Sequence, residues 1–453
     1  MKIVVISSTD HAVWQFRSEF IATLIYNKHD VIVISPDGPF AERIRCLGAR
    51  HIEVPVSRFI GPLSDLFYLL RLYRLLHILK PDFVYTMTTK PNIFCPGIAK
   101  LTRVPQVCSV FGGLGFIYSE GGGLLARTIK KVARIMLKFG TKFTDHFVFQ
   151  NKEDRDIFIH EGILKNKHYI VVNGSGVNLR EFSMESVNIQ HVAEIRKELG
   201  ISETGIFVLM ISRISRNKGI LEFIEASQFF SDMKGSIKFI HAGSFENGSL
   251  EEISQNQIKE TLLFKQIGYR TDIRELIYAA DIIALPSYHR EGIPNVLLEA
   301  MAMKKPIITT DNVGCRDVVN DGVNGILVPV RNPEALALAI RHLANDPVTR
   351  STFGEAGFEK VKQYFTVESV NKTILSKIFQ LKDINIPEFF TEDTDEQLLI
   401  TLNGKKQYFT VSPISKNCVL NGGQQQKNNK KSIFNFRSIE KGISQPEELR
   451  KVG

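Results

Sequence analysis

Two glutamates eight positions apart, Glu291 and Glu299, are the residues of this sequence whose spacing most strongly suggests a ligand-binding site. Glu291 precedes a predicted helix that begins near Pro294, because proline fits the first helical turn, and Glu299 lies about one and a half turns into it. Free N–H groups at a helix start favour anions, and Gly292 lets a ligand approach the backbone closely. The segment could hold a nucleotide sugar, with the diphosphate at the helix start and hydroxyl groups on the carboxylates. A plain amphipathic helix with solvated glutamates would show the same spacing.

Two basic residues follow another predicted strand, at 208–213. Arg213 ends this strand, and Lys218 lies just before the next predicted helix. In open α/β sheets ligands bind outside the carboxyl ends of the strands, so this cation pair could neutralise a diphosphate as it leaves. An ordinary solvated basic loop is the alternative interpretation.

The order of the apolar segments predicts the α/β fold that would position these residues. Strand-like runs alternate with helical patterns in the first part of the chain, and a second such series spans residues 206–343. A stretch at 173–199 with glycines and then polar residues separates the two series. We therefore expect two domains, at residues 1–180 and 181–382, with the site in the cleft between them.

Residues 383–453 look foreign to both domains. Residues 383–404 hold six acidic residues and no Lys or Arg, whereas residues 405–453 hold ten basic residues against three acidic ones. The run at 424–431 is of low complexity. We expect a non-catalytic and largely disordered tail, in which the Asn403-Gly404 turn signal would allow one short hairpin.

The composition excludes several classes of protein. A hydrophobic content of 43% in 453 residues supplies ample core. Five scattered cysteines form neither a disulfide framework nor a metal-ligand pattern, which favours a reducing compartment. The sequence opens on a strand-like run instead of a signal peptide, and no apolar run reaches the ~18 residues of a spanning helix. We therefore expect a cytoplasmic protein.

The net charge of +9 is concentrated in the first half of the chain. Residues 1–180 hold 24 Lys and Arg against 14 Asp and Glu, an excess of ten. Such a basic half favours an anionic partner, which could be nucleic acid, a phosphorylated small molecule or an acidic lipid surface. No aromatic-basic motif or nucleic-acid-binding module accompanies the charge, so we expect no nucleic-acid partner.

The predicted helix at 124–139 favours an anionic membrane surface as a partner. Its cations fall within about 100° of one helical face. They are Arg127, Lys130, Lys131, Arg134 and Lys138. The opposing apolar residues are Leu125, Ile129, Val132, Ala133, Met136 and Phe139. Such a helix could lie on the inner face of the cell membrane, or its apolar stripe could pack on the sheet, and the two arrangements can coexist.

Together these motifs resemble the family 4 (group 1) glycosyltransferases over about residues 1–380. The glutamate pair, the two cations and a third segment at 311–325 with several glycines occur in the order and spacing of that family. The glycines of the third segment could also be simple turns. The resemblance implies the GT-B architecture of two facing Rossmann-like domains. It also implies transfer of a sugar from a nucleotide donor, by family expectation UDP, with retention of anomeric configuration.

The resemblance also implies roles for individual residues. Glu291 would contact the transferred sugar, Arg213 and Lys218 would bind the donor diphosphate, and we expect these three as the catalytic residues. Glu299 would hold the nucleotide ribose. The remaining residues expected at the nucleotide are Gly292, Ile293, Pro294, Asn295, Val296 and Leu298. Because the cations and the helix start oppose the diphosphate, we expect no metal and no further cofactor.

Segments of the first half narrow the expected acceptor. The segments at 88–92, 111–116 and 149–151 look like those of bacterial members that add hexoses or N-acetylhexosamines to undecaprenyl-diphosphate-linked saccharides. A lipid-linked saccharide is therefore the expected acceptor. Lys90 could bind its phosphate, although an isolated lysine is more often solvated. The glycines of 111–116 could admit a ligand or form a tight loop.

Two departures from the family pattern concern the acceptor side. Phe111 stands where many members carry a histidine, and the loop at 7–17 holds no glycine. His11 or Asp10 could activate the acceptor instead. No protein base is obligatory, because an oxygen of the leaving diphosphate could take the acceptor proton.

Other functions remain open at this point. The same transfer could act on a soluble acceptor, the chain could be a non-catalytic sugar-nucleotide-binding relative, or it could be a GT-B-fold sugar-nucleotide epimerase. An epimerase would share the cleft but not the set of three motifs.

Overall fold

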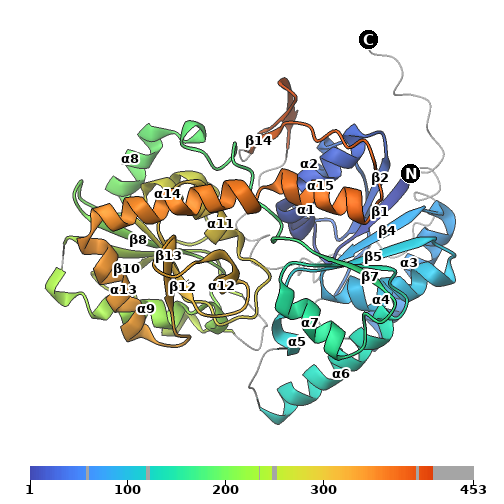
Figure 1. Cartoon of the computed structure of the whole chain (residues 1–453), viewed down its shortest axis with the longest axis horizontal. Coiled ribbons are helices and arrows are strands. Elements are labelled where there is room, and N and C mark those ends of the chain that lie inside the picture. Colours follow the sequence, from blue (N-terminus) through green and yellow to red (C-terminus); the bar gives the residue numbers. More distant parts are fainter. Residues whose placement is uncertain (58–60, 119–122, 234, 247–251, 394–396, 412–453) are drawn as a thin grey trace, which may run out of the picture.

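The computed structural model describes residues 1–57, 61–118, 123–233, 235–246, 252–393 and 397–411. These residues form two α/β units that lie side by side, each built on a parallel sheet (Figure 1). The two-unit α/β arrangement expected from the sequence is confirmed.

The first sheet has seven parallel strands in the order β3-β2-β1-β4-β5-β6-β7. They are β1 (Lys2–Ile6), β2 (Asp30–Ser35), β3 (Arg50–Glu53), β4 (Phe83–Met87), β5 (Gln106–Phe111), β6 (His146–Phe149) and β7 (His168–Val171). Every residue of β4 is buried, which is why such strands are continuous apolar runs in the sequence. The strand order reverses between β1 and β4, and such a reversal leaves a crevice at the carboxyl ends of the strands.

Helices cover both faces of the first sheet. They are α1 (Asp10–Tyr26), α2 (Ala41–Cys46), α3 (Pro62–Leu79), α4 (Thr89–Leu101), α5 (Gly115–Tyr118), α6 (Leu124–Thr141) and α7 (Lys152–His160). Val4 of β1 shares a core with α3 and α4, whereas the neighbouring Val5 shares the opposite core with α1. Helix α6 lies along the outer side of α4.

The second sheet has six parallel strands in the order β10-β9-β8-β11-β12-β13. They are β8 (Ile206–Ile211), β9 (Ile237–Ala242), β10 (Phe264–Gln266), β11 (Ile282–Leu285), β12 (Ile307–Thr310) and β13 (Gly325–Val328). Its α-helices are α8 (Ile189–Glu198), α9 (Ile220–Gln228), α10 (Ile273–Ala279), α11 (Asn295–Ala302), α12 (Cys315–Val318), α13 (Pro333–Asn345) and α14 (Pro347–Tyr364). Short 3₁₀ helices are η1 (Met184–Ser186), η2 (Arg216–Lys218), η3 (Ser231–Met233) and η4 (Gln255–Gln257). One continuous apolar core unites this unit.

The chain passes between the two units twice, and the two passages are hydrogen-bonded to each other. Val177 N donates to Phe365 O at 2.9 Å, and Val367 N donates to Val177 O at 3.1 Å. Gly176 has a φ of +81°, and a Cβ there would lie 2.5 Å from Val367 Cα. Only glycine therefore fits where the two passages touch.

Helix α15 (Val367–Lys377) returns the chain to the first unit. Its residues Val370 and Ile374 lie in the same core as α1. From the sequence this helix was expected in the second domain, at residues 181–382, because its position along the chain gives no sign of the return.

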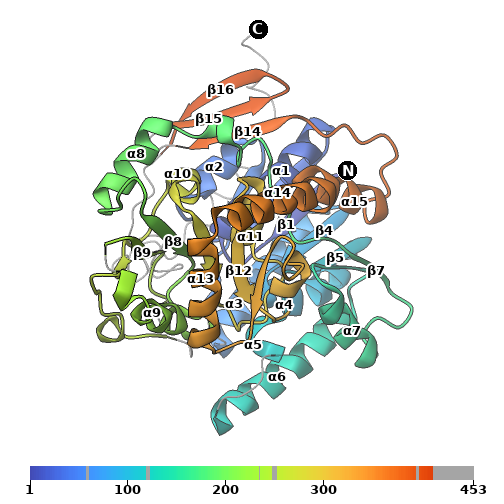
Figure 2. The same ribbon diagram turned by 60° about the vertical axis from the view of Figure 1, so that its left-hand side comes forward.

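A three-stranded antiparallel sheet follows, beside α1 (Figures 1 and 2). Its strands are β14 (Phe389–Asp393), β15 (Gln397–Leu402) and β16 (Lys405–Thr410). The hairpin at Asn403-Gly404 is confirmed, and both turn residues have positive φ. The prediction of a disordered tail is wrong for these strands, because Leu398 and Ile400 bury their side chains in the first domain. Residues 412–453 of the predicted tail lie outside the described residues.

Candidate functional site

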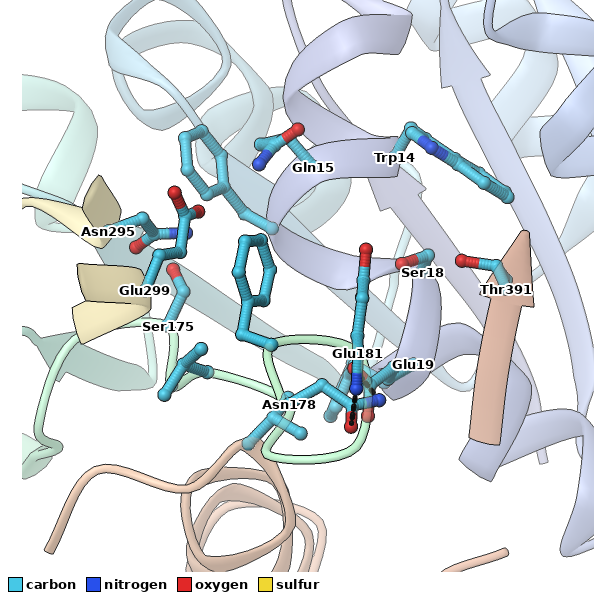
Figure 3. A pocket seen from close by; sticks show the side chains of 16 residues that line it. Trp14, Gln15, Ser18, Glu19, Ser175, Asn178, Glu181, Asn295, Glu299 and Thr391 are labelled. Atoms are coloured by element: carbon cyan, nitrogen blue, oxygen red, sulfur yellow. Dashed lines mark hydrogen bonds between the residues drawn. The ribbon is translucent and has the colours of Figure 1, made fainter. Parts of the chain in front are cut away.

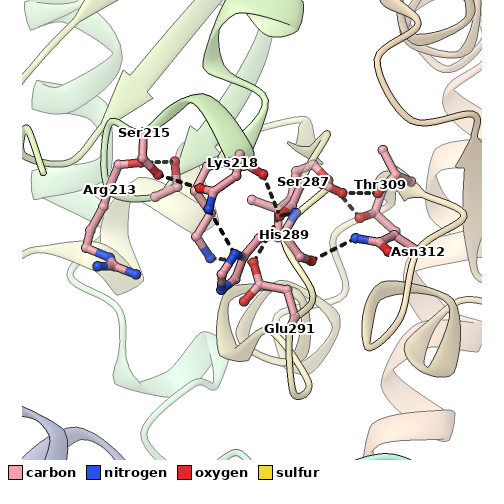
Figure 4. Close-up of polar contacts among 12 residues, drawn as sticks. Arg213, Ser215, Lys218, Ser287, His289, Glu291, Thr309 and Asn312 are labelled. Atoms are coloured by element: carbon pink, nitrogen blue, oxygen red, sulfur yellow. Dashed lines mark hydrogen bonds and ion pairs between the residues drawn. The ribbon is translucent and has the colours of Figure 1, made fainter. Parts of the chain in front are cut away.

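The two charged motifs lie side by side because the strands that precede them, β8 and β11, are neighbours in the second sheet (Figure 4). The loop after β8 carries Lys218, and the loop after β11 carries Glu291. Backbone bonds fix one loop to the other, since Tyr288 N and His289 N each donate to Asn217 O at 2.9 Å. The sequence placed these motifs on separate strand ends, and the sheet order brings them together.

Glu291 and Lys218 form an ion pair at the centre of this site. Ser287 Oγ also donates to Glu291 Oε1, at 2.9 Å. Burial alone would raise the pKa of Glu291, but the Lys218 ammonium and these hydrogen bonds outweigh it and lower the pKa to about 2. Glu291 is therefore an ionised acceptor of hydrogen bonds at neutral pH and not a proton donor.

Arg213 lies on the same loop as Lys218 but points away from Glu291 (Figure 4). Its guanidinium pairs with Glu246 at 2.6 Å and is 59% exposed. Burial lowers the pKa of His11 in the first domain; the neighbouring Asp10 carboxylate raises it, and the more distant Arg213 charge lowers it.

The helix expected at Pro294 begins one residue later, at Asn295. Pro294 takes the N-cap position with an extended ψ of 117°. Gly292 was expected to let a ligand approach, but a Cβ there would lie 2.2 Å from Gln150 Oε1 and 2.8 Å from the Gly112 carbonyl carbon. Close contact with the first domain is thus sufficient reason for glycine at this position.

Glu299 lies in a pocket between the domains, opposite the start of α1 (Figure 3). Trp14, Gln15, Glu181 and Asn295 also line this pocket. Within the described part of the chain, the Glu299 carboxylate has no recorded hydrogen bond or ion pair, although the residue is 93% buried. Burial, and then the nearby Glu181, raises the pKa of Glu299 to about 8. The carboxyl group is therefore available to a ligand.

Not every residue predicted around the nucleotide reaches this pocket. Leu298 is fully buried in the core of the second domain and is not among the residues that line the pocket. Ile293 packs against Gly174, where a Cβ would lie 2.9 Å from the Ile293 Cβ. Val296 packs against the same core as Leu298. These three side chains support the loop, and only backbone atoms near them can face a ligand.

Replacing Glu299 by glutamine should make the fold more stable, increasingly so at higher pH. The pKa of about 8 in the folded state exceeds the ordinary value of 4.5 in an unfolded chain, so the folded state binds the extra proton and stability falls as the pH rises between these values. Urea unfolding at pH 5 and pH 8.5 should show almost no difference between wild type and E299Q at the lower pH. At the higher pH, E299Q should be more stable by about 4–5 kcal/mol, because each unit of the pKa difference corresponds to about 1.4 kcal/mol. The exposed Glu359→Gln is the control, and an equal pH slope for E299Q and wild type would contradict the assignment.

His289 is a site residue to which the sequence analysis gave no role. Ser215 Oγ donates to Asn217 Oδ1 at 2.8 Å, which turns the Asn217 amide nitrogen toward His289 Nδ1 at 2.9 Å. Burial lowers the pKa of His289, so the ring is neutral and its proton is on Nε2. Nε2 lies near Gly115 of the first domain. In the sequence, only its position two residues before Glu291 could have indicated that His289 belongs to this site.

The glycine segment of the first domain packs directly on the Glu291 loop. Gly113 has a φ of +104°, and a Cβ there would lie 2.5 Å from Gly292 N. Asn151 Nδ2 donates to Glu291 O at 3.3 Å. The two weak motifs of the first half, at 111–116 and 149–151, thus meet at the loop of Glu291.

The structure shows the surroundings of the first-domain residues that the sequence linked to the acceptor. Lys90 is buried and paired with Asp65 at 2.5 Å, so it is not a free phosphate ligand. The Asp10 carboxylate accepts hydrogen bonds from Phe40 N and His11 N, each at 2.8 Å. The His11 ring packs edge-on against Phe40, at a centroid distance of 5.1 Å. Phe111 packs on the Phe149 and Phe158 rings, at centroid distances of 5.5 and 4.8 Å.

The third motif divides into two parts with different roles. Gly314 lies behind the site, where a Cβ would stand 1.7 Å from Gly292 O. Asp321 and Gly325 instead form an isolated bridge around a turn before β13, as the alternative interpretation held. In the part of the chain that the structure describes, no group of three or more His, Cys, Asp or Glu side chains could hold a metal ion.

Comparisons with known protein families match both halves of the chain. Residues 18–178 match the description Glycosyltransferase Family 4, and residues 191–360 match Glycosyl transferases group 1. The boundary between the two matches falls in the connection that the sequence analysis placed near residue 180.

Two curated relatives resemble most of the chain. One is N,N'-diacetylbacillosaminyl-diphospho-undecaprenol alpha-1,3-N-acetylgalactosaminyltransferase of Campylobacter jejuni, 29% identical over 371 residues, which are 80% of this chain and 95% of that protein. The other is UDP-Gal:alpha-D-GlcNAc-diphosphoundecaprenol alpha-1,3-galactosyltransferase of Escherichia coli, 27% identical over 70% of this chain and 80% of its own length. Among solved structures, Anabaena HepE in complex with UDP-glucose superimposes with a TM-score of 0.70 at 19% identity, covering 84% of this chain and all of that one.

Proposed function

We propose, from the premise that this chain is a glycosyltransferase of the group 1 and family 4 type with a GT-B fold, that it transfers a hexose or N-acetylhexosamine to a lipid-diphosphate-linked saccharide. Two observations carry the proposal: the Lys218–Glu291 ion pair on the loops after β8 and β11, and the buried Glu299 carboxylate that lines the pocket between the domains. The printed names of both curated relatives describe transfer to undecaprenyl-diphosphate-linked sugars. The product would enter a cell-surface polysaccharide or glycan.

A UDP-sugar is the donor that we propose. The E. coli relative is named for UDP-Gal, and the Anabaena structure contains UDP-glucose. In this chain the ribose hydroxyls would reach Glu299, and the diphosphate would lie between Lys218, Arg213 and the start of α11. Ionised Glu291 would accept a hydrogen bond from a hydroxyl of the transferred sugar.

The proposed reaction retains the anomeric configuration. The bond between the anomeric carbon and the diphosphate oxygen breaks as the acceptor oxygen forms a bond on the same face, and the acceptor proton moves to the leaving diphosphate. Lys218 and Arg213 offset the negative charge that develops on that diphosphate. The cleft holds the acceptor hydroxyl close to the anomeric carbon. We propose no metal and no other cofactor for this step.

Mass spectrometry of the product tests the proposal. The purified protein is incubated with a polyprenyl-diphosphate-linked saccharide and, separately, UDP-GlcNAc, UDP-GalNAc, UDP-glucose or UDP-galactose. We expect the acceptor mass to rise by one hexose or N-acetylhexosamine with one donor. Transfer only to a soluble sugar would instead support an enzyme with a soluble acceptor. An isomerised donor would support an epimerase, and donor binding without any product would support a non-catalytic relative.

We also propose that the first domain binds an anionic membrane from the cytoplasmic side. On α6, Val132, Ile135 and Phe139 are exposed, and on the same side of the sheet α3 exposes a further apolar stripe. That stripe comprises Leu63, Leu66, Phe67 and Leu70. No helix within the described residues is both long and apolar enough to cross a membrane.

The basic face of α6 differs from the expected one. Lys130 is buried. Arg134 donates to Ile117 O at 3.0 Å, and Lys138 donates to Glu161 O at 2.9 Å. Arg127, Lys131, Arg134 and Lys138 are exposed, but the last two also donate to backbone carbonyls. The proposed contact therefore combines apolar insertion with one exposed cation fewer than the sequence suggested.

Vesicle co-sedimentation should locate this contact. The double variant I135S/F139S should partition at least about tenfold less onto phosphatidylglycerol vesicles than wild type, because two exposed apolar side chains lose their transfer into lipid. The control L338S/V348S removes two equally exposed apolar residues from α13 and α14 of the other domain and should bind normally. Equal pelleting of both double variants, or equal wild-type binding to phosphatidylcholine alone, would count against the anionic membrane face.

A further inference from the structure

Asp154 of α7 is a fully buried carboxylate with partners from both domains. Oδ2 accepts hydrogen bonds from Leu114 N and from Asn151 Nδ2, each at 3.0 Å. Oδ1 accepts from Arg290 Nε at 2.7 Å. The Asp154 side chain is 0% exposed and that of Arg290 is 18% exposed. One carboxylate therefore joins the glycine segment of the first domain to the loop of Glu291 in the second.

The Asp154–Arg290 contact matters because Arg290 belongs to the loop of Glu291. Arg290 immediately precedes Glu291, whose own carbonyl accepts from Asn151. Gly113 packs on Gly292 from the other side. Three independent contacts from the first domain thus converge on the loop that carries the ionised glutamate.

The pair depends on the closed arrangement of the domains. A buried carboxylate that loses its cation is strongly unfavourable, whereas both groups are well solvated when they separate into water. Breaking the pair therefore favours separation of the two loops, which would hydrate Asp154. A second ion pair joins α7 to α12 of the second domain: Arg316 and Glu153 are 3.9 Å apart and a little under half exposed, so this pair contributes little.

We propose that Asp154 and Arg290 are positioning residues for sugar transfer. Their ion pair holds the glycine segment, residues 112–115, against the loop of Glu291 and so aligns the acceptor side of the cleft with the bound donor. Neither residue needs to touch the substrates. The part of this inference that concerns sugar transfer rests on the proposed function.

The expected signature is loss of turnover with donor binding retained. Arg290→Met and Asp154→Asn should each lower kcat for transfer about tenfold or more, and the double variant should be no worse than the poorer single variant, because the pair acts as one unit. The dissociation constant for UDP should change less than about threefold. Arg290→Lys keeps the charge and should retain an intermediate kcat. The control is Glu153→Gln, which removes only the exposed pair.

Hydrogen exchange at the Leu114 amide provides a readout that does not depend on the reaction. Arg290→Met leaves the Leu114 bond to Asp154 intact in the closed form, so faster exchange in this variant reports release of the glycine segment. Unchanged exchange, equal loss of turnover in E153Q, or multiplicative losses in the double variant would overturn the inference. Faster exchange in a protein that transfers no sugar would support the positioning contact and reject the proposed function.

Discussion

Replacing Lys218 with methionine is expected to lower kcat by about a thousandfold, the upper range for removal of one group that stabilises developing charge. Lys218 has two roles in the proposed reaction. It offsets charge on the departing diphosphate, and it keeps Glu291 ionised. Both roles end with one substitution, whereas methionine keeps most of the volume of the side chain.

The same variant should acquire a new pH dependence. Without Lys218, burial becomes the dominant influence on Glu291 and raises its pKa, so a proton occupies the carboxylate at lower pH. The residual kcat of the variant should therefore rise with pH between 5.5 and 8. In the wild type Glu291 stays ionised over this range and should cause no such rise. The matched control is Lys197→Met, an exposed lysine of α8. A fall in activity of less than tenfold would reject the role of Lys218 at the diphosphate. A pH profile identical to wild type would reject its role in keeping Glu291 ionised.

The second large effect is expected from Gly314→Ala. Gly314 has a φ of +81°, and its Cβ would stand 1.7 Å from Gly292 O and 3.0 Å from Glu291 Cβ. Gly322→Ala is a close control, because Gly322 has a φ of +71° with no atom within 4 Å of the added Cβ. The control should cost about 1–2 kcal/mol, the price of a left-handed alanine.

G314A carries that backbone cost and also a clash with a carbonyl oxygen that cannot rotate away. The Glu291 loop must therefore shift, and a displacement of about 1 Å in a positioned group can cost a hundredfold in rate. Urea unfolding and steady-state turnover measure the two effects separately. If G314A and G322A lose equal stability and equal activity, contact with the Glu291 loop is not the reason for glycine at position 314.

The placement of Glu291 and Lys218 at strand ends was largely predictable from the sequence, because the signals for it are local. Glu291 and Lys218 each follow an apolar strand within a few residues, and the carboxyl ends of parallel strands share one edge of a sheet. His289 was missed because nothing in the linear sequence shows that Asn217 and Ser215 fix its tautomer. Leu298 was misplaced because spacing on a helix does not show which neighbours face the core.

The first domain was less predictable, because its polar residues find partners far away in the chain. Lys90 looked like a solvated or phosphate-binding lysine, yet its partner Asp65 lies on the preceding helix. Asp154 precedes its partner Arg290 by 136 positions. The hairpin of β15 and β16 was expected only as a possibility, because an isolated hairpin is marginal in water. Strand β14 was not expected, and the apolar surface that supports all three strands belongs to α1 and its neighbours.

The paired passages of the chain between the domains limit how the cleft can open. Two unconnected linkers would let the domains twist, slide and separate independently. Here the backbone bonds that link Val177 to Phe365 and Val367 tie both linkers together at one place, so we expect the domains to pivot there when the cleft opens. A distance measured across the cleft, for example between a pair of spin labels, is then expected to follow that opening.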